Sequence, residues 1–222
     1  MRHTLDFEKT ISDLQEKIEK LKDSGSDKTS LVEVNEQIEE IKVKIDKKLN
    51  EIYKKLTPWH KLQVARHPER PHFLDYVKEL FQDFEPLSGD RSFKEDPALL
   101  CGLATFDGHS VIIMGHDKGR NTEGRIKHNF GMAKPEGYRK AIRLMKLAEK
   151  FDIPIITFVD TAGAFPGKEA EERGQSESIA SSILTSLKIE SPIISIVIGE
   201  GGSGGAIALA TADRILMLEH SI

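Results

Sequence analysis

Apolar side chains recur every three or four residues through the first 56 residues of the chain. This spacing places them on one face of a helix, and a polar segment at 23–27 divides the pattern into two parts. The pattern predicts two helices that pair as an antiparallel hairpin, which packs either on the protein's own body or against another subunit. The apolar positions are Phe7, Ile11, Leu14, Ile18 and Leu21, then Leu31, Val34, Ile38, Ile41, Ile45, Leu49, Ile52 and Leu56.

Residues 57–97 predict a linker that carries one short amphipathic helix. Thr57-Pro58 and the prolines at 68 and 71 interrupt the helical pattern, because proline cannot donate a backbone hydrogen bond and restricts the residue before it. Between residues 72 and 84, apolar side chains fall on one helical face again. We therefore expect a helix over 72–84.

Residues 98–222 predict an α/β domain. Two β-type runs, 98–106 and 109–115, flank Asp107-Gly108, a dipeptide that suits a hairpin turn because both residues tolerate positive φ. Helical and strand patterns then alternate, which favours a mostly parallel sheet covered by helices. The expected helices are 138–151, 175–187 and 203–211, and the expected strands are 153–159, 192–198 and 214–218.

Composition and charge narrow the classes of function. The chain has 32 Lys and Arg against 36 Asp and Glu, a net charge of −4, which argues against a nucleic-acid binder held by bulk positive charge. No apolar run approaches the ~18 residues of a membrane span, so we expect a cytoplasmic protein without a membrane partner. The single cysteine, Cys101, excludes an internal disulfide and a cysteine-based zinc site within the chain.

Two glycine-containing loops are the candidate site of chemistry. Residues 160–167 follow one expected strand, and residues 199–205 follow the next and lead directly into a helix of small residues. Ligands of α/β proteins bind beyond the carboxyl ends of strands, and glycines let backbone N–H groups approach a ligand at the positive end of a helix. The pattern suits an anion or a developing oxyanion, unless the glycines serve only close packing.

The second loop also matches two other motifs. Gly199 to Gly204 fits the dinucleotide pattern Gly-x-Gly-x-x-Gly, with Glu219 at the expected distance. Gly201 to Gly205 fits Gly-x-Ser-x-Gly, which would make Ser203 the nucleophile of a serine hydrolase. Both are the weaker alternatives, because strands precede the loop and few residues follow it to supply a hydrolase acid and histidine. The first loop lacks the spacing of a Walker A motif.

A basic stretch between residues 118 and 146 is the third feature. It holds nine basic residues against two glutamates, so it favours an anionic ligand, a nucleotide or a nucleic acid, unless its helix face is merely solvated. His116 and His128 are not placed near a carboxylate by their spacing. The basic residues are Lys118, Arg120, Arg125, Lys127, Lys134, Arg139, Lys140, Arg143 and Lys146.

At these residues the sequence resembles the α-subunit family of bacterial acetyl-coenzyme A carboxylase carboxyltransferase. The resemblance implies a crotonase-type α/β fold, a β-β-α spiral. It also implies transfer of a carboxyl group from carboxybiotin to acetyl-CoA, which gives malonyl-CoA for fatty-acid synthesis. The matching stretches are LDFEK (5–9), LTPWHKLQVARHPERP (56–71), LSGDR (87–91), KGRNT (118–122), NFGMAKPEGYRK (129–140), DTAGAFPG (160–167), EERGQSE (171–177) and GEGGSGG (199–205).

The resemblance also implies a site built from backbone amides. Amides at a helix N-terminus would stabilise the charge that develops on the ureido oxygen of biotin, so no protein nucleophile is needed and Ser203 becomes a turn residue. The expected oxyanion-hole donors are the amides of Gly204, Gly205 and Ala206. The expected substrate-binding residues are Gly163, Ala164, Phe165, Gly201, Gly202, Lys118, Arg120, Lys134 and Arg139.

Partners follow from the same resemblance. Family members form an α₂β₂ assembly whose β subunit carries a zinc ribbon, and biotin is attached to a separate biotin carboxyl carrier protein that biotin carboxylase loads. We expect the helical hairpin to contact the β subunit. Family members continue well beyond residue 218, so we also expect this chain to lack C-terminal helices and to be inactive alone.

Overall fold

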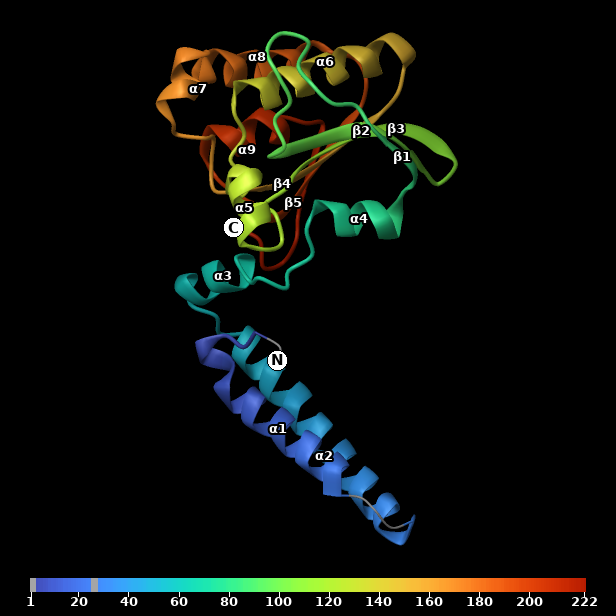
Figure 1. Cartoon of the computed structure of the whole chain (residues 1–222). Helices are drawn as coiled ribbons and strands as arrows, with labels where there is room; N and C mark the ends of the chain where they lie inside the picture. Colours follow the sequence, from blue (N-terminus) through green and yellow to red (C-terminus); the bar gives the residue numbers. More distant parts are fainter. Residues whose placement is uncertain (1–2, 25–27) are drawn as a thin grey trace. The chain divides into compact units, whose positions relative to one another are not determined.

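The computed structural model describes the backbone of residues 3–24 and 28–222, and the side chains of 3–23 and 34–222 (Figure 1). The chain forms two compact units, Met1–His67 and Pro68–Ile222. The segment 57–97, expected as a linker, is therefore divided between them. Within the described residues, no helix has both the length and the apolarity needed to cross a membrane.

The first unit is a helical hairpin followed by a short helix. Its elements are a 3₁₀ helix at Asp6–Glu8, α1 at Lys9–Ser24, α2 at Lys28–Tyr53 and α3 at Pro58–Ala65. Thr57-Pro58 begins α3 rather than a linker, because the Thr57 hydroxyl accepts the His60 N–H at 3.2 Å and proline fits the first helical position.

The predicted antiparallel pairing of the two long helices is confirmed. Ile11 and Ile18 of α1 form one buried cluster with Ile38 and Ile45 of α2. The Tyr53 hydroxyl at the end of α2 donates to Glu8 at 2.6 Å, next to the start of α1. The expected break at 23–27 lies mostly outside the described residues, since 25–27 are not described.

The second unit is built on a six-stranded sheet whose strands follow one another in chain order. The first three strands are antiparallel, with the predicted turn at Asp107-Gly108, where both residues have positive φ. The third to sixth strands are parallel, as the alternating pattern predicted. The strands are β1 Gln82–Pro86, β2 Leu99–Phe106, β3 His109–His116, β4 Ile155–Thr161, β5 Ile193–Gly201 and β6 Arg214–Met217.

Three helices cover one face of the sheet. In Figure 1, α6 (Pro135–Phe151) and α8 (Gln175–Lys188) lie above the strands together with α9 (Ser203–Ala210). Leu144 of α6, Val159 of β4 and Leu209 of α9 belong to one buried core on this face. The segment between β3 and α6 contains α5 (Thr122–Lys127) and a 3₁₀ turn at Asn129–Gly131, and α7 (Lys168–Glu172) precedes α8.

The opposite face is covered by α4 (Phe73–Leu80). Phe73 is fully buried, and its ring occupies the space that a side chain at Gly115 of β3 would fill. The helix expected over 72–84 ends at Leu80, and its last residues form β1. The apolar spacing of the last residues is compatible with a helix and with a strand. As a strand, residues 82–86 form backbone hydrogen bonds with β2, which a continued helix could not do.

Loss of the Phe73 ring should destabilise the second unit. We expect Phe73→Ala to lower the free energy of opening by about 3–5 kcal/mol, because it leaves a cavity between α4 and β3. Leu74→Ala on the same helix removes an exposed side chain and should cost about 0.5 kcal/mol or less. Native-state hydrogen exchange of the β3 amides measures both; equal losses would contradict this packing.

Candidate active site at two glycine-rich loops

The two candidate loops meet at the carboxyl ends of β4 and β5. These strands are parallel neighbours, with Val159 opposite Val197 and Thr161 opposite Gly201. The Gly202 N–H donates to the Thr161 carbonyl at 2.8 Å, which joins the two loops just beyond the strands. Residues 40 positions apart are thereby brought into one site.

The loops approach so closely that side chains cannot fit between them. A β-carbon at Gly202 would overlap the Ala162 carbonyl, and one at Gly205 would lie 2.6 Å from the Ala164 nitrogen and from the Gly163 carbonyl carbon. A β-carbon at Gly204 would lie 3.5 Å from Ile179, an ordinary contact. Close approach therefore requires glycine at 202 and 205, whereas 204 has more room.

The first turn of α9 presents unpaired donors. Ser203 begins the helix with a positive φ of 56°, and the N–H groups of Gly204 and Gly205 have no acceptor within the described residues. The Ala206 N–H donates to the Gly202 carbonyl at 3.1 Å. The Ala206 amide is therefore already hydrogen-bonded within the helix, and its expected role as an oxyanion-hole donor stays a prediction.

The facing loop is held by its own hydrogen bonds. The Thr161 hydroxyl accepts the Gly163 N–H at 3.1 Å and donates to the Gly163 carbonyl at 2.7 Å. The Phe165 N–H donates to Ala133 at 3.0 Å. Ala164, between them, therefore faces Gly205 on a fixed backbone.

Gln175 is a supporting residue that the sequence did not single out. Its buried side-chain amide donates to the carbonyls of Ala133 and Phe165, both at 2.9 Å, and so fastens the facing loop to the segment before α6. It lies in the matching stretch 171–177, but its spacing carries no signal of these contacts.

Two expected substrate-binding lysines lie beside the loops. The Lys134 ammonium is 4.4 Å from the centre of the Phe165 ring and 3.4 Å from Glu169. Lys118 is paired with Asp160 at 2.6 Å and with Glu200 at 2.8 Å. The structure therefore brings both lysines to the site but gives each a protein partner.

The two expected arginines contact other parts of the protein. Arg120 is exposed and pairs with Asp75 of α4. Arg139 donates to the Arg173 carbonyl and lies 3.7 Å from Asp90. Neither has a described contact with the glycine-rich loops.

Two further residues of the basic stretch, Lys140 and Arg143, also bind other parts of the protein. Buried Lys140 pairs with Glu95 and donates to the Asp96 carbonyl at 3.1 Å. Arg143 donates to the carbonyls of residues 87–89. Internal pairing reduces the positive charge available to a nucleic acid, so the nucleic-acid alternative is not supported.

The histidines also differ from expectation. His128 lies 3.1 Å from Asp117, although its spacing placed it near no carboxylate. His116 is fully buried at the end of β3, and burial lowers its pKa to about 3.

Within the described residues, neither a histidine nor a carboxylate is hydrogen-bonded to exposed Ser203, so the serine-hydrolase alternative lacks its base. The described side chains also include no group of three or more metal-ligating residues.

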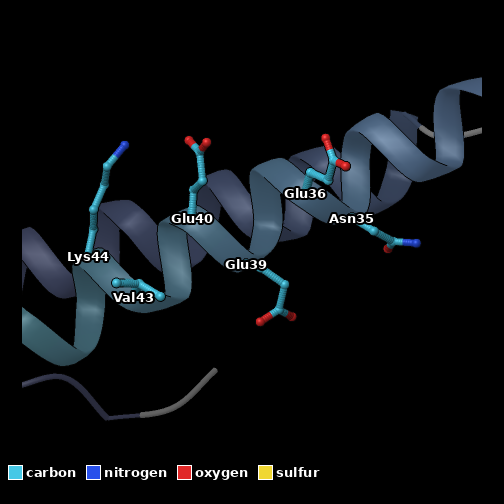
Figure 2. Close-up of a pocket in the computed structure, with 6 residues that line it drawn as sticks. All are labelled: Asn35, Glu36, Glu39, Glu40, Val43 and Lys44. Carbon is cyan, nitrogen blue, oxygen red and sulfur yellow. The ribbon is translucent and has the colours of Figure 1, made fainter.

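A hollow on α2 is not a competing site. It is lined by Asn35, Glu36, Glu39, Glu40, Val43 and Lys44. Figure 2 shows that Glu40 and Lys44 point to one side of the helix and Glu39 to the other. These side chains do not converge on a common point.

Comparison with known proteins identifies the family. A family model described as acetyl co-enzyme A carboxylase carboxyltransferase-like matches residues 4–222. The acetyl-coenzyme A carboxylase carboxyl transferase subunit alpha of Paramagnetospirillum magneticum is 58% identical over 99% of this chain and 69% of its own length. That of Agrobacterium fabrum is 55% identical over 100% of this chain and 70% of its own length.

The chain belongs to the acetyl-coenzyme A carboxylase carboxyltransferase α-subunit family.

Solved structures confirm the fold expected for this family. The β subunit of Pseudomonas aeruginosa geranyl-CoA carboxylase matches with a TM-score of 0.54 at 22% identity, over 69% of this chain and 28% of its own. Transcarboxylase 12S matches with a TM-score of 0.57 at 16% identity, over 72% of this chain and 32% of its own. The crotonase-type α/β class is therefore confirmed.

Buried His116 should make stability depend on pH. Its pKa is about 3 in the fold and ~6.5 in an unfolded chain, so between these values the unfolded chain binds more protons. The free energy of unfolding should fall as pH falls from 6.5, by up to ~1.4 kcal/mol per pH unit from this residue.

The matched variant is His116→Asn, which cannot take up this proton. Urea unfolding at pH 7, 6 and 5 should show a shallower loss of stability for the variant. If the free energy of unfolding changed equally with pH in the two proteins, His116 would not be the source of the pH dependence.

Proposed function

We propose that the chain is the α subunit of the carboxyltransferase component of acetyl-CoA carboxylase, and that it takes part in carboxyl transfer from carboxybiotin to acetyl-CoA. The carboxyl transferase names of relatives at 55–58% identity support this function. The main support for this site is the start of α9. The N–H groups of Gly204 and Gly205 have no acceptor within the described residues, and Gly205 packs against Gly163-Ala164.

The backbone N–H groups of Gly204 and Gly205 are suited to stabilise an oxyanion. Gly204 and Gly205 lie at the N-terminus of an eight-residue helix, where the backbone carries partial positive charge. When bound, carboxybiotin supplies the carboxyl group, and its loss leaves negative charge on the ureido oxygen. Fixed N–H donors stabilise such charge without reorganising, and each is worth about 10²–10³ in rate.

The other site residues shape the cavity rather than react. Ala164 and half-buried Phe165 give the facing wall an apolar surface. Gly201 ends β5, and Gly202, which has no β-carbon, packs against the Ala162 carbonyl. Gln175 and Thr161 fix this wall through backbone hydrogen bonds. We assign no nucleophile or base to this chain, because Ser203 has no hydrogen-bonded base.

Partners and location belong to the same proposal. We place the chain in the cytoplasm, in an α₂β₂ complex with a zinc-containing β subunit, served by a biotin carboxyl carrier protein and biotin carboxylase. The family of the chain supports this assembly. With Cys101 as its one cysteine, the sequence offers no thiolate set of its own for the zinc.

The direct test is reconstitution. The full-length α subunit that contains this chain, combined with a carboxyltransferase β subunit and a carboxylated biotin carrier, should form malonyl-CoA from acetyl-CoA, and omission of the α subunit should abolish the product. Ser203→Ala should retain turnover if the backbone donors carry catalysis. Complete loss with an intact complex would instead support a nucleophilic serine.

Bulk at position 205 should stop transfer. Gly205→Val should lower kcat by about 10² or more, because its side chain displaces Gly163-Ala164 and the donors beside them. Gly204→Ala places its β-carbon 3.5 Å from Ile179 and should cost about tenfold or less. Steady-state malonyl-CoA formation in the assembled complex measures both; near-normal turnover of Gly205→Val would refute the site.

A further inference from the structure

One cation lies between carboxylates from the bases of both glycine-rich loops. Lys118 follows β3 by two residues, and its ammonium is 2.6 Å from Asp160 Oδ1 of β4 and 2.8 Å from Glu200 Oε2 of β5. Asp160 and Glu200 are both buried, and the lysine side chain is 17% exposed. The three residues therefore join three adjacent parallel strands at their carboxyl ends.

The backbone is fitted around this ion pair. Asp160 Oδ1 also accepts the Glu200 N–H at 2.8 Å, and a β-carbon at Gly199 would overlap the same carboxylate. A β-carbon at Gly131 would lie 2.8 Å from Lys118 Cγ, so the lysine stem is packed against the segment before α6. The ammonium is thus confined to its carboxylate partners.

Each carboxylate is continuous with one of the loops. Asp160 is followed by Thr161, whose carbonyl accepts the Gly202 N–H, and Glu200 is followed by Gly201 and Gly202. The contact of Gly205 with Gly163-Ala164 lies only a few residues further along both loops. The spacing between the two carboxylates therefore sets how the loops meet.

We propose that Lys118 is a positioning residue that holds the two loops in register, and that it does not contact substrate. The inference rests on the proposed function and replaces the substrate-binding role expected from the basic stretch. Without the ammonium, two buried carboxylates would face each other with no cation between them, and charge repulsion would push them apart. The donors of Gly204 and Gly205 would then leave their aligned position.

The test is a charge-rescue series in the assembled complex. Lys118→Met should lower kcat by about 10²-fold with KM values for acetyl-CoA and carrier changed less than about twofold, because misalignment acts on the reacting geometry. Adding Glu200→Gln removes the repulsion and keeps hydrogen-bonding groups, so the double variant should recover most of the lost kcat. Lys146→Met removes an exposed charge of the same stretch and serves as the matched control.

A substrate-binding role for Lys118 would give different results. It predicts a KM increase of about tenfold with kcat unchanged, and no rescue by Glu200→Gln; either result overturns the proposal. Hydrogen exchange of residues 202–205 in the intact protein provides a readout without activity. Exchange should accelerate in Lys118→Met and return toward wild type in the double variant, and unchanged exchange would overturn the proposal even if the wild type made no malonyl-CoA.

Discussion

The close approach of two backbone segments is the constraint on which the site depends. Gly205 can touch Gly163-Ala164, and Gly202 can touch Ala162, only because neither glycine has a β-carbon. The other end of α9 is fixed as well. Thr157 of β4 donates to the Leu209 carbonyl at 2.9 Å, and Ser182 of α8 donates to the Ala208 carbonyl at 2.7 Å. The helix is thereby held at both ends, so its N-terminal amides have a defined direction.

Several charged side chains of the second unit hold irregular segments. The basic residues of α6 bind the segment before β2: Lys140 pairs with Glu95, and Arg143 donates to carbonyls of residues 87–89. Buried Glu136 pairs with Arg173 at 3.0 Å and connects α6 to the turn before α8. Six of the nine basic residues in the stretch 118–146 pair within the protein, which spacing along the chain does not distinguish from a ligand surface.

The sequence predicted features that depend on neighbours along the chain. The hairpin stripe, the turn at Asp107-Gly108 and the alternating strands and helices are periodic or local, and the structure contains them. The end of α4 was predicted wrongly, because β1 is stabilised by pairing with β2 rather than by its own periodicity. The contacts of His128 with Asp117 and of Lys118 with Glu200 join distant segments, so no spacing rule could find them. The hydrogen bond from the Ala206 N–H to Gly202 could be predicted only if the exact first residue of α9 were known.

In the proposed site of backbone amides, activity depends on the side chains that hold the backbone in place. Only a substitution to proline removes a peptide N–H, so the rate at such a site depends on where the N–H points. Thr161 and Gln175 orient one wall of the site through hydrogen bonds, and Lys118 ties the bases of both walls by ion pairs. Because these contacts come from three strands and from α8, a small displacement of any of them changes the angle between the donors and the developing charge. Catalytic competence in such a site is therefore a property of the packed sheet edge as a whole.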